Sequence, residues 1–215
     1  ARGTDVVAAL VETHGRPPVE EQVEGLPQIP PRTFEHDGAR GEELDVEAVL
    51  ERRPDVVLVD DLAHTNTPGS RNAKRWQDVE EILDAGIDVI STLNIEHLES
   101  LADVVESITG VPQRDSVPDH VVREAEQIEL VDMTPEALRR RMAHGNVYPA
   151  ERVDAALSQY FRVGNLAALR ELALLWLADR VDEGLERYRQ DHDIESTWAA
   201  RERVVVALTG GPESD

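Results

Sequence analysis

Two adjacent carboxylates follow a short apolar run in the segment VVLVDDLAHTNTPG, which spans residues 56–69. Four apolar residues followed by an acid make the pattern of a Walker B strand, whose first carboxylate holds Mg²⁺, commonly through water. In that interpretation Asp60 is the metal-binding residue and Asp61 lies near an attacking water. The alternative is an acidic turn that caps the next helix, and the pattern by itself leaves both open.

Polar residues also follow the other apolar runs of the first 133 residues. In a parallel sheet, ligands bind in the crevice beyond the carboxyl ends of the strands. The residues that we expect to bind a nucleotide there are Thr13, His14, Asp60, Asp61, Thr92 and Asn94. Asp132 ends the last of these runs. His14 has an alternative role as a hydrogen-bonded structural residue. A zinc site built from His14, His64 and His97 is a further alternative, but these histidines lack any recognised ligand spacing.

Four runs rich in Val, Ile and Leu are predicted to be the strands that position these residues, and most of them lack clean alternation. They occupy residues 5–15, 55–62, 88–94 and 127–133. Helical patterns separate them, at about 45–53, 73–85 and 97–108. Near-continuous apolar strands that alternate with helices indicate an α/β fold with a mainly parallel sheet. Within the helix at 73–85, the spacing of Trp76, Val79 and Leu83 predicts the buried face.

The pattern changes after residue 133. Thr134 followed by Pro135 is a good helix start, because a hydroxyl caps the helix and proline suits its first turn. Further helices are expected over about 150–162 and from a cap at Asn165 to about 190. Residues 204–208 then read as a strand. The most loop-like stretch is 16–32, which holds five prolines.

Composition excludes several classes of protein. With 44 acidic and 22 basic residues the net charge is −22, which argues against a nucleic-acid footprint. The chain has no cysteine, hence no disulfide or thiol chemistry. No apolar run is long enough to span a membrane, and no signal peptide is visible. The string G-x-x-x-x-G-K-[ST] that forms a phosphate-binding P-loop does not occur either.

Several long strings make the chain resemble the amino-terminal cytoplasmic region of the KdpD family of potassium-sensing histidine kinases. The start of a universal-stress-protein-like domain is suggested by RERVVVALTGG at 201–211. The other matching strings are VETHGR (11–16), LVDDLAHTNTPGSRNAKRWQDVEEILDAGIDV (58–89), STLNIEHLESLADVVESITGV (91–111) and NVYPAERVDAALSQYFRVGNLAALRELAL (146–174).

The resemblance implies a P-loop-type domain over 1–133, a helical extension over 134–195, and a linker with the start of the stress-protein-like domain over 196–215. It also implies ATP and Mg²⁺ as cofactors, with Mg²⁺ near Asp60. The family is a set of two-component sensors on the cytoplasmic face of the plasma membrane. They phosphorylate a response regulator that switches on a high-affinity potassium pump. The kinase catalytic module lies downstream in the family, so enzymatic activity in this region stays open.

Departures from the family pattern temper this expectation. The family's GxxPGVGKT loop precedes the position of GTDVV, and this chain opens there without Met, so we expect an amino-terminally truncated domain that binds ATP weakly. Asp61 stands where the family usually has Glu, which puts hydrolysis in doubt. Two other functions remain as alternatives: a stand-alone P-loop enzyme, and an interaction domain without nucleotide binding.

Overall fold

The computed structural model describes residues 3–13, 15–36, 39–143 and 160–191. The chain divides into two compact units, Ala1–Trp176 and Leu177–Asp215. The helix predicted over 150–162 lies almost wholly outside the described residues, as does the strand predicted over 204–208. In the described part of the chain, no helix combines the length and the apolar character that crossing a membrane requires.

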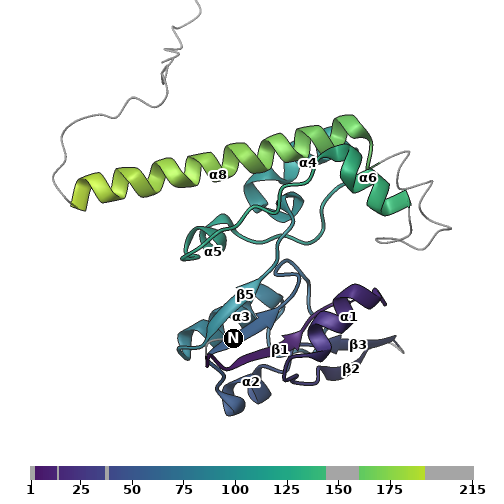
Figure 1. Cartoon of the computed structure of the whole chain (residues 1–215), viewed down its shortest axis with the longest axis vertical. Helices are drawn as coiled ribbons and strands as arrows, with labels where there is room; N and C mark the ends of the chain where they lie inside the picture. Colours follow the sequence, from purple (N-terminus) through teal and green to yellow (C-terminus); the bar gives the residue numbers. More distant parts are fainter. Residues whose placement is uncertain (1–2, 14, 37–38, 144–159, 192–215) are drawn as a thin grey trace, which may run out of the picture. The chain divides into compact units, whose positions relative to one another are not determined.

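A parallel sheet of three strands forms the centre of the first unit. The strands are β1 (Val6–Leu10), β4 (Val56–Val59) and β5 (Asp88–Ser91), in the order β1-β4-β5. Val57 of β4 pairs with Val7 on one side and with Val89 on the other. Figure 1 shows the three strands side by side. The predicted α/β architecture with a mainly parallel sheet is therefore confirmed for these strands.

Two helices that contact each other pack beside this sheet, namely α2 (Val46–Arg52) and α3 (Arg75–Asp84). Val57, Val49 and Ile82 are fully buried where strand β4 and the two helices meet. Each such side chain contributes about 1.5–3 kcal/mol to folding through its burial. Because strand β4 is packed in this way, the backbone position of the residues that follow it is well defined.

The ends of these helices follow from local chemistry. The Asp45 carboxylate accepts a hydrogen bond of 3.0 Å from the backbone N–H of Ala48 and so caps α2. Helix α2 ends at Arg53, which takes a left-handed conformation with φ of 49° just before Pro54. Gly86 follows α3 with φ of 79°, a conformation that favours glycine. The predicted helices at 45–53 and 73–85 are thus confirmed within two residues.

The stretch between β1 and α2 differs from the prediction. Residues 16–32 were expected to be a loop, but helix α1 covers Pro17–Glu24. Two prolines at the first turn suit a helix start, because the first backbone N–H groups need no partner inside the helix. Strands β2 (Arg32–His36) and β3 (Ala39–Glu43) then pair as an antiparallel hairpin that the sequence pattern did not predict.

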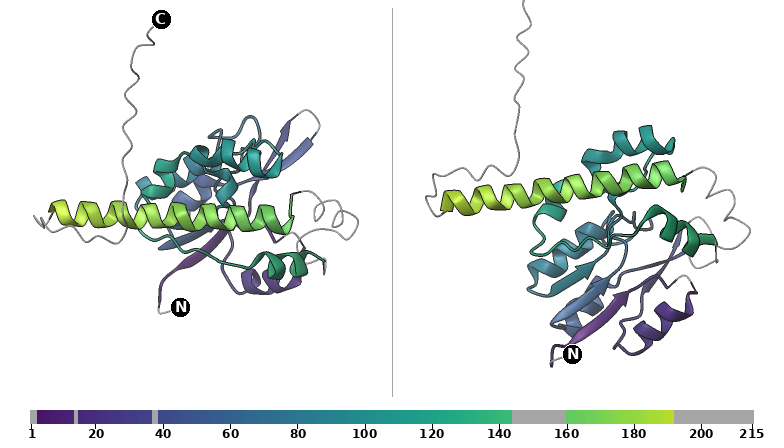
Figure 2. Two further views of the ribbon diagram at one scale, coloured as in Figure 1. Left: turned by 90° about the horizontal axis from the view of Figure 1, so that it is seen from above. Right: turned by 45° about the horizontal axis from the view of Figure 1, so that its top comes forward.

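Beyond β5 the chain forms short helical turns before a regular helix. They are η1 (Ile95–His97), η2 (Glu99–Leu101) and α4 (Ala102–Thr109). The extended backbone of Leu98, whose side chain is buried, interrupts the helix predicted over 97–108. Gly110 follows α4 with φ of 72°, a left-handed conformation that favours glycine. Figure 2 gives two further views of these turns and of the sheet.

The strand predicted over 127–133 is wrong. Helix α5 (Asp119–Arg123) is followed by irregular chain through these residues, none of which pairs with the sheet. Val131 leaves 83% of its surface exposed, so the apolar run does not enter the core. Asp132 instead accepts two hydrogen bonds from the Arg170 guanidinium, at 2.6 and 2.5 Å. Asp132 therefore does not join the candidate site at the strand ends.

Two later helices complete the described structure. Helix α6 (Pro135–Ala143) begins as predicted, because the backbone N–H of Ala137 donates to the Thr134 hydroxyl at 3.3 Å. Helix α8 (Val163–Asp191) begins before Asn165, so the predicted cap there is wrong. The Asn165 side chain instead donates to the Tyr160 carbonyl at 3.1 Å. Among the residues of α8 whose burial the structure describes, Leu166 and Leu169 are buried.

Candidate functional site

Asp60 joins the carboxyl ends of the three parallel strands. Its backbone N–H continues the sheet by donating to Leu10 at 2.8 Å. One oxygen of its carboxylate accepts hydrogen bonds from the Thr92 hydroxyl and from the backbone N–H of Asp61, the latter at 3.1 Å. The other oxygen accepts from the backbone N–H of Glu12 at 3.3 Å. The structure therefore brings the predicted residues Asp60 and Thr92 into direct contact.

Asp61 lies beside Asp60 in a different environment. Its φ of 54° is in the left-handed region, which costs a non-glycine residue roughly 1 kcal/mol or more. Its backbone N–H also donates to the Thr92 hydroxyl at 3.1 Å. Within the described part of the chain, its carboxylate has no hydrogen-bond partner. One ligand atom each from Asp61, Glu12 and His64 lie within 4.8 Å of one another.

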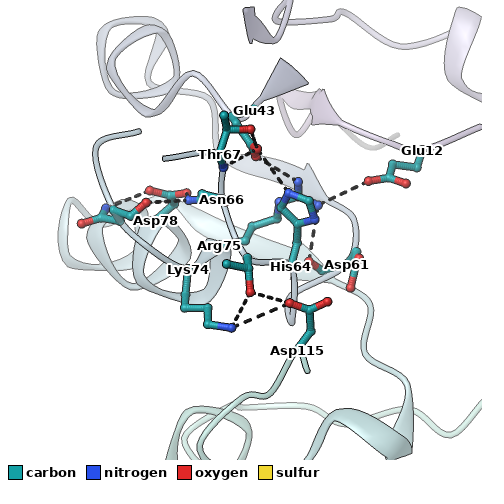
Figure 3. A network of polar contacts seen from close by, with 12 residues as sticks. Glu12, Glu43, Asp61, His64, Asn66, Thr67, Lys74, Arg75, Asp78 and Asp115 are labelled. Atoms are coloured by element: carbon teal, nitrogen blue, oxygen red, sulfur yellow. Dashed lines mark hydrogen bonds and ion pairs between the residues drawn. The ribbon is translucent and has the colours of Figure 1, made fainter. Parts of the chain in front are cut away.

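A buried ion pair contacts the backbone of the loop that begins at Asp60. Arg75, at the start of α3, is 1% exposed, and Glu43, at the end of β3, is 3% exposed. A guanidinium nitrogen lies 3.4 Å from the Glu43 carboxylate, and the other donates to the Asp60 carbonyl at 3.0 Å. Figure 3 shows the Arg75 and Glu43 side chains pointing toward each other. The pair therefore fixes the backbone that carries both aspartates.

Glu43 is kept ionised by its neighbours. Burial alone would raise the pKa of its carboxyl, but the Thr67 hydroxyl and backbone N–H, together with His64, outweigh burial and hold the pKa below its usual range. The two Thr67 contacts measure 2.7 and 2.8 Å, and His64 Nε2 lies 3.2 Å away. Gly41 allows this approach, because a Cβ there would lie 2.4 Å from the Thr67 hydroxyl oxygen. The charge of Glu43 is therefore available to Arg75.

A second buried carboxylate shapes the loop that follows His64. Asp78 is 2% exposed and accepts hydrogen bonds from the side-chain amides of Asn66 and Asn72, at 2.6 and 2.8 Å. Burial raises the pKa of Asp78, and these amides only partly offset it. The contact holds the loop 66–72 against helix α3.

A hollow of about 270 Å³ lies beside this loop and is bordered by the hairpin and the start of α2. Its walls include Phe34, Glu43, Asn66 and Arg71. The predicted nucleotide residues do not line it. Glu43 therefore faces two places: the hollow and the strand-end site held by Arg75.

The remaining predicted residues are less closely tied to this site. The Thr13 hydroxyl contacts Glu20 and the backbone N–H of Gly15, both at 3.4 Å, and so supports the turn into α1. Asn94 precedes η1 without capping it through its side chain. His14 lies outside the described residues. Whether any of these residues binds a nucleotide stays a prediction.

Sequence reasoning missed the buried charges, although helical spacing could have found them. Trp76, Val79 and Leu83 were expected to form the buried face of α3, but Leu83 is 49% exposed. The buried residues of α3 are Arg75, Asp78, Val79 and Ile82. This set recurs every three or four residues, which is the spacing of one helix face. The two charged members of the set concealed the pattern, since charged residues are rarely buried unless paired.

The carboxyl ends of the strands carry more acidic than basic side chains. Glu12, Glu43, Asp60 and Asp61 supply four carboxylates, and Arg75 supplies one guanidinium. This excess of negative charge attracts cations and repels free anions. A phosphate group would therefore bind here only with a cation or with further backbone donors.

Fold and site together define an α/β domain with an acidic site at the ends of its parallel strands. Comparison with known proteins makes this more specific. Residues 1–181 match the family described as the osmosensitive K+ channel His kinase sensor domain, KdpD. The chain belongs to this family of sensor domains.

Curated relatives agree over almost the whole chain. It is 72% identical over 214 residues to sensor protein KdpD of Mycobacterium tuberculosis (strain CDC 1551 / Oshkosh), covering 100% of this chain and 25% of that protein. Identity to sensor protein KdpD of Rathayibacter rathayi is 61%, covering 99% and 25% of the two chains. For that of Escherichia coli (strain K12) the identity is 46%, covering 97% and 23%. The chain thus spans about a quarter of these relatives' length.

Proposed function

We propose that this domain is the regulatory, nucleotide-binding part of a two-component sensor histidine kinase that responds to potassium limitation or osmotic stress. Membership of the KdpD family supports the signalling role. The observation that carries nucleotide binding is the position of Asp60, whose carboxylate joins the ends of β1, β4 and β5. Carboxylates in this place commonly hold the Mg²⁺ of a bound nucleotide.

The site suits a cation held through water. Both oxygens of Asp60 already accept hydrogen bonds from the protein, so water would bridge the carboxylate to Mg²⁺. When bound, Mg²⁺ would neutralise charge on the nucleotide's phosphates. Thr92 and Asn94 would sense the outermost phosphate, and Thr13 and His14 would border the nucleotide. A glycine-rich loop, which the family resemblance places before residue 3, would supply the backbone donors for the phosphates.

The domain would act through its neighbours in the same protein. Nucleotide occupancy would pass through the helical region 134–190 to the domains that follow and alter their kinase or phosphatase activity. The kinase module would then phosphorylate a response regulator that controls a potassium pump. The domain would lie on the cytoplasmic face of the membrane, and neither nucleic acid nor lipid would contact it directly.

One observation favours a second candidate, an interaction domain without a nucleotide. The Thr92 hydroxyl donates to Asp60, and both carboxylate oxygens of Asp60 accept hydrogen bonds from the protein without any ligand. A carboxylate whose hydrogen-bond partners all belong to the protein can have a purely structural role, here the connection of three strands. In that case the strand ends would be a structural joint and the signalling surface would lie elsewhere.

Calorimetric titration with MgATP separates the two candidates. The protein would be the chain extended upstream through the glycine-rich loop, compared with its Asp60→Asn and Asp103→Asn forms. Asp103 is an exposed acid of α4, so its variant makes the same change of charge away from the site. We expect Asp60→Asn to weaken binding at least tenfold and Asp103→Asn to leave it unchanged. Negligible binding by all three would leave the interaction domain as the function.

A further inference from the structure

We propose that residues 115–120 form a connecting segment through which a change at the ends of the parallel strands alters helix α8. Two strand-end segments carry the candidate residues after β4 and β5, namely 60–74 and 92–100. The connecting segment contacts both of them, and it also contacts Trp176 of α8. The proposal goes beyond nucleotide binding, because the coupling does not depend on which ligand the strand ends bind.

The strand-end segment 60–74 is joined to Asp115 through a hydroxyl and an ammonium group. The Thr65 hydroxyl donates to the Asp115 carboxylate, and the Lys74 ammonium donates to the Thr65 hydroxyl at 2.5 Å. The ammonium nitrogen also lies 3.8 Å from the Asp115 carboxylate. Figure 3 shows the Lys74 ammonium pointing toward this carboxylate. A single cation therefore holds the first strand-end segment against the connecting segment.

The strand-end segment 92–100 pairs with the connecting segment along the backbone. The backbone N–H of Val117 donates to the His97 carbonyl at 2.8 Å, and that of Glu99 donates to the Val117 carbonyl at 3.1 Å. The Nδ1 atom of His97 lies 3.0 Å from the Asp115 carbonyl oxygen. Leu98 and Val117, which form this bridge, are 2% and 0% exposed. Because the bridge is buried, the two segments should move together.

Asp119 carries the connection to α8. Its carboxylate accepts hydrogen bonds from the backbone N–H and the hydroxyl of Ser100, at 3.0 and 2.7 Å. The indole N–H of Trp176 donates at 3.1 Å to the same oxygen that binds the Ser100 hydroxyl. The next residue, His120, packs edge-to-face against Trp76 of α3, with ring centroids 6.4 Å apart. One carboxylate oxygen therefore joins the end of the second strand-end segment to α8.

The contacts at the two ends of the connecting segment differ from those in its middle. Val117 is fully buried, whereas the side chain of Asp115 is 43% exposed and that of Lys74 is 25% exposed. Polar contacts of this kind are individually weak, because water competes for the same groups. A ligand that draws on either strand-end segment can therefore displace the end of the connecting segment, and the buried middle carries the displacement to Asp119.

Amide hydrogen exchange of the 215-residue chain tests the coupling without any ligand. Lys74→Met removes the ammonium group and keeps a side chain of similar length. Arg71→Met is the matched control, because it removes a positive charge from the same segment, and the ion pairs of Arg71 are with Glu47 and Glu81. Trp176→Phe removes the indole N–H and keeps an aromatic ring. The variant that combines Lys74→Met with Trp176→Phe completes a double-mutant cycle.

We expect Lys74→Met to accelerate amide exchange at residues 163–176 roughly fivefold or more, the lower range of coupling between sites. Arg71→Met should leave exchange there unchanged. Coupling is reciprocal, so Trp176→Phe should accelerate exchange at residues 64–66. In the double variant, residues 163–176 should exchange no faster than in Trp176→Phe alone, because the connection is already cut.

The amides of α2 report on general loss of stability, and their exchange should stay unchanged in every variant. Acceleration in α2 equal to that at 163–176 would overturn the proposal. The same conclusion would follow if Lys74→Met and Arg71→Met had equal effects on α8. Effects of Lys74→Met and Trp176→Phe that simply add in the double variant would also overturn it, because independent sites behave in that way.

Discussion

Two groups of polar side chains lie beside the loop after β4, and they differ in burial and in whether their carboxylates have donors from the protein. The buried network consists of Glu43, Arg75 and Thr67, and its two charged members are at most 3% exposed. The open cluster consists of Glu12, Asp61 and His64, all half-buried. In the first group every carboxylate oxygen has a donor from the protein. In the second, the Asp61 carboxylate has none within the described residues.

This difference indicates that stability and ligand binding depend on different residues of the same domain. A buried charge without its partner is expensive, so the buried network must stay intact for the loop to keep its position. A half-buried carboxylate costs less to leave unpaired, because water solvates it until a ligand arrives. The buried network should therefore govern folding, and the open cluster should govern ligand binding.

Substitution of the buried arginine should have the largest effect. Arg75→Met leaves the Glu43 carboxylate buried without its counter-ion, which should lower the free energy of unfolding by about 3–5 kcal/mol. Urea denaturation would measure the loss. Arg71→Met is the control, because Arg71 forms its ion pairs with Glu81 and Glu47 at the surface. If both variants unfolded at the same urea concentration, the ion pair of Arg75 and Glu43 would not stabilise the folded protein more than the surface ion pairs do.

Removing one hydroxyl from the same network should have an intermediate effect. Thr67→Val deletes the donor 2.7 Å from Glu43 and should cost about 1.5–3 kcal/mol at pH 7, typical of a hydrogen bond to a charged group. The pKa of Glu43 is lowered in the folded protein, so the stability it contributes is complete above its unfolded value, about 4.3. That stability is lost as the pH falls through the lower folded pKa.

The gap between wild type and Thr67→Val should therefore shrink as the pH falls below about 4. Urea denaturation at several pH values between 7 and 3 would measure it. A gap that stayed constant over this range would mean that the hydroxyl does not act through the ionised form of Glu43.

The smallest effect on folding is expected at the open cluster. Asp61→Gly removes a carboxylate but suits the φ of 54°, so the free energy of unfolding should stay within about 1 kcal/mol of the wild type. Arg53→Gly is a matched control, because Arg53 has a similar φ of 49° and ends α2. Thermal denaturation would compare the two. A loss at Asp61 as large as that of Arg75→Met would place Asp61 in the structural network.

The same distinction explains how much the sequence could predict. Apolar runs and helix ends are local signals, and they correctly indicated β1, β4, β5, α2 and α3. Asp60 and Thr92 were brought together in the prediction because the ends of parallel strands share one edge of the sheet. Such inferences need only the pattern of a short segment and a general rule of packing.

Other features depend on partners that a local pattern does not contain. The run at 127–133 has the composition of a strand, but none of its residues pairs with the sheet, and Asp132 binds Arg170 instead. The ion pair of Glu43 and Arg75 joins residues 32 positions apart on a hairpin and a helix. The hairpin itself was missed, and with it the position of Glu43.

Backbone chemical shifts recorded during a titration with MgATP would test the central claim most directly. The protein is the chain extended upstream through the glycine-rich loop, with amide resonances assigned. The account predicts saturable shifts at residues 60–66 and 92–94, where the strands β4 and β5 end. Shifts confined to other regions, or none at millimolar MgATP, would contradict the proposal that these strand ends bind a nucleotide.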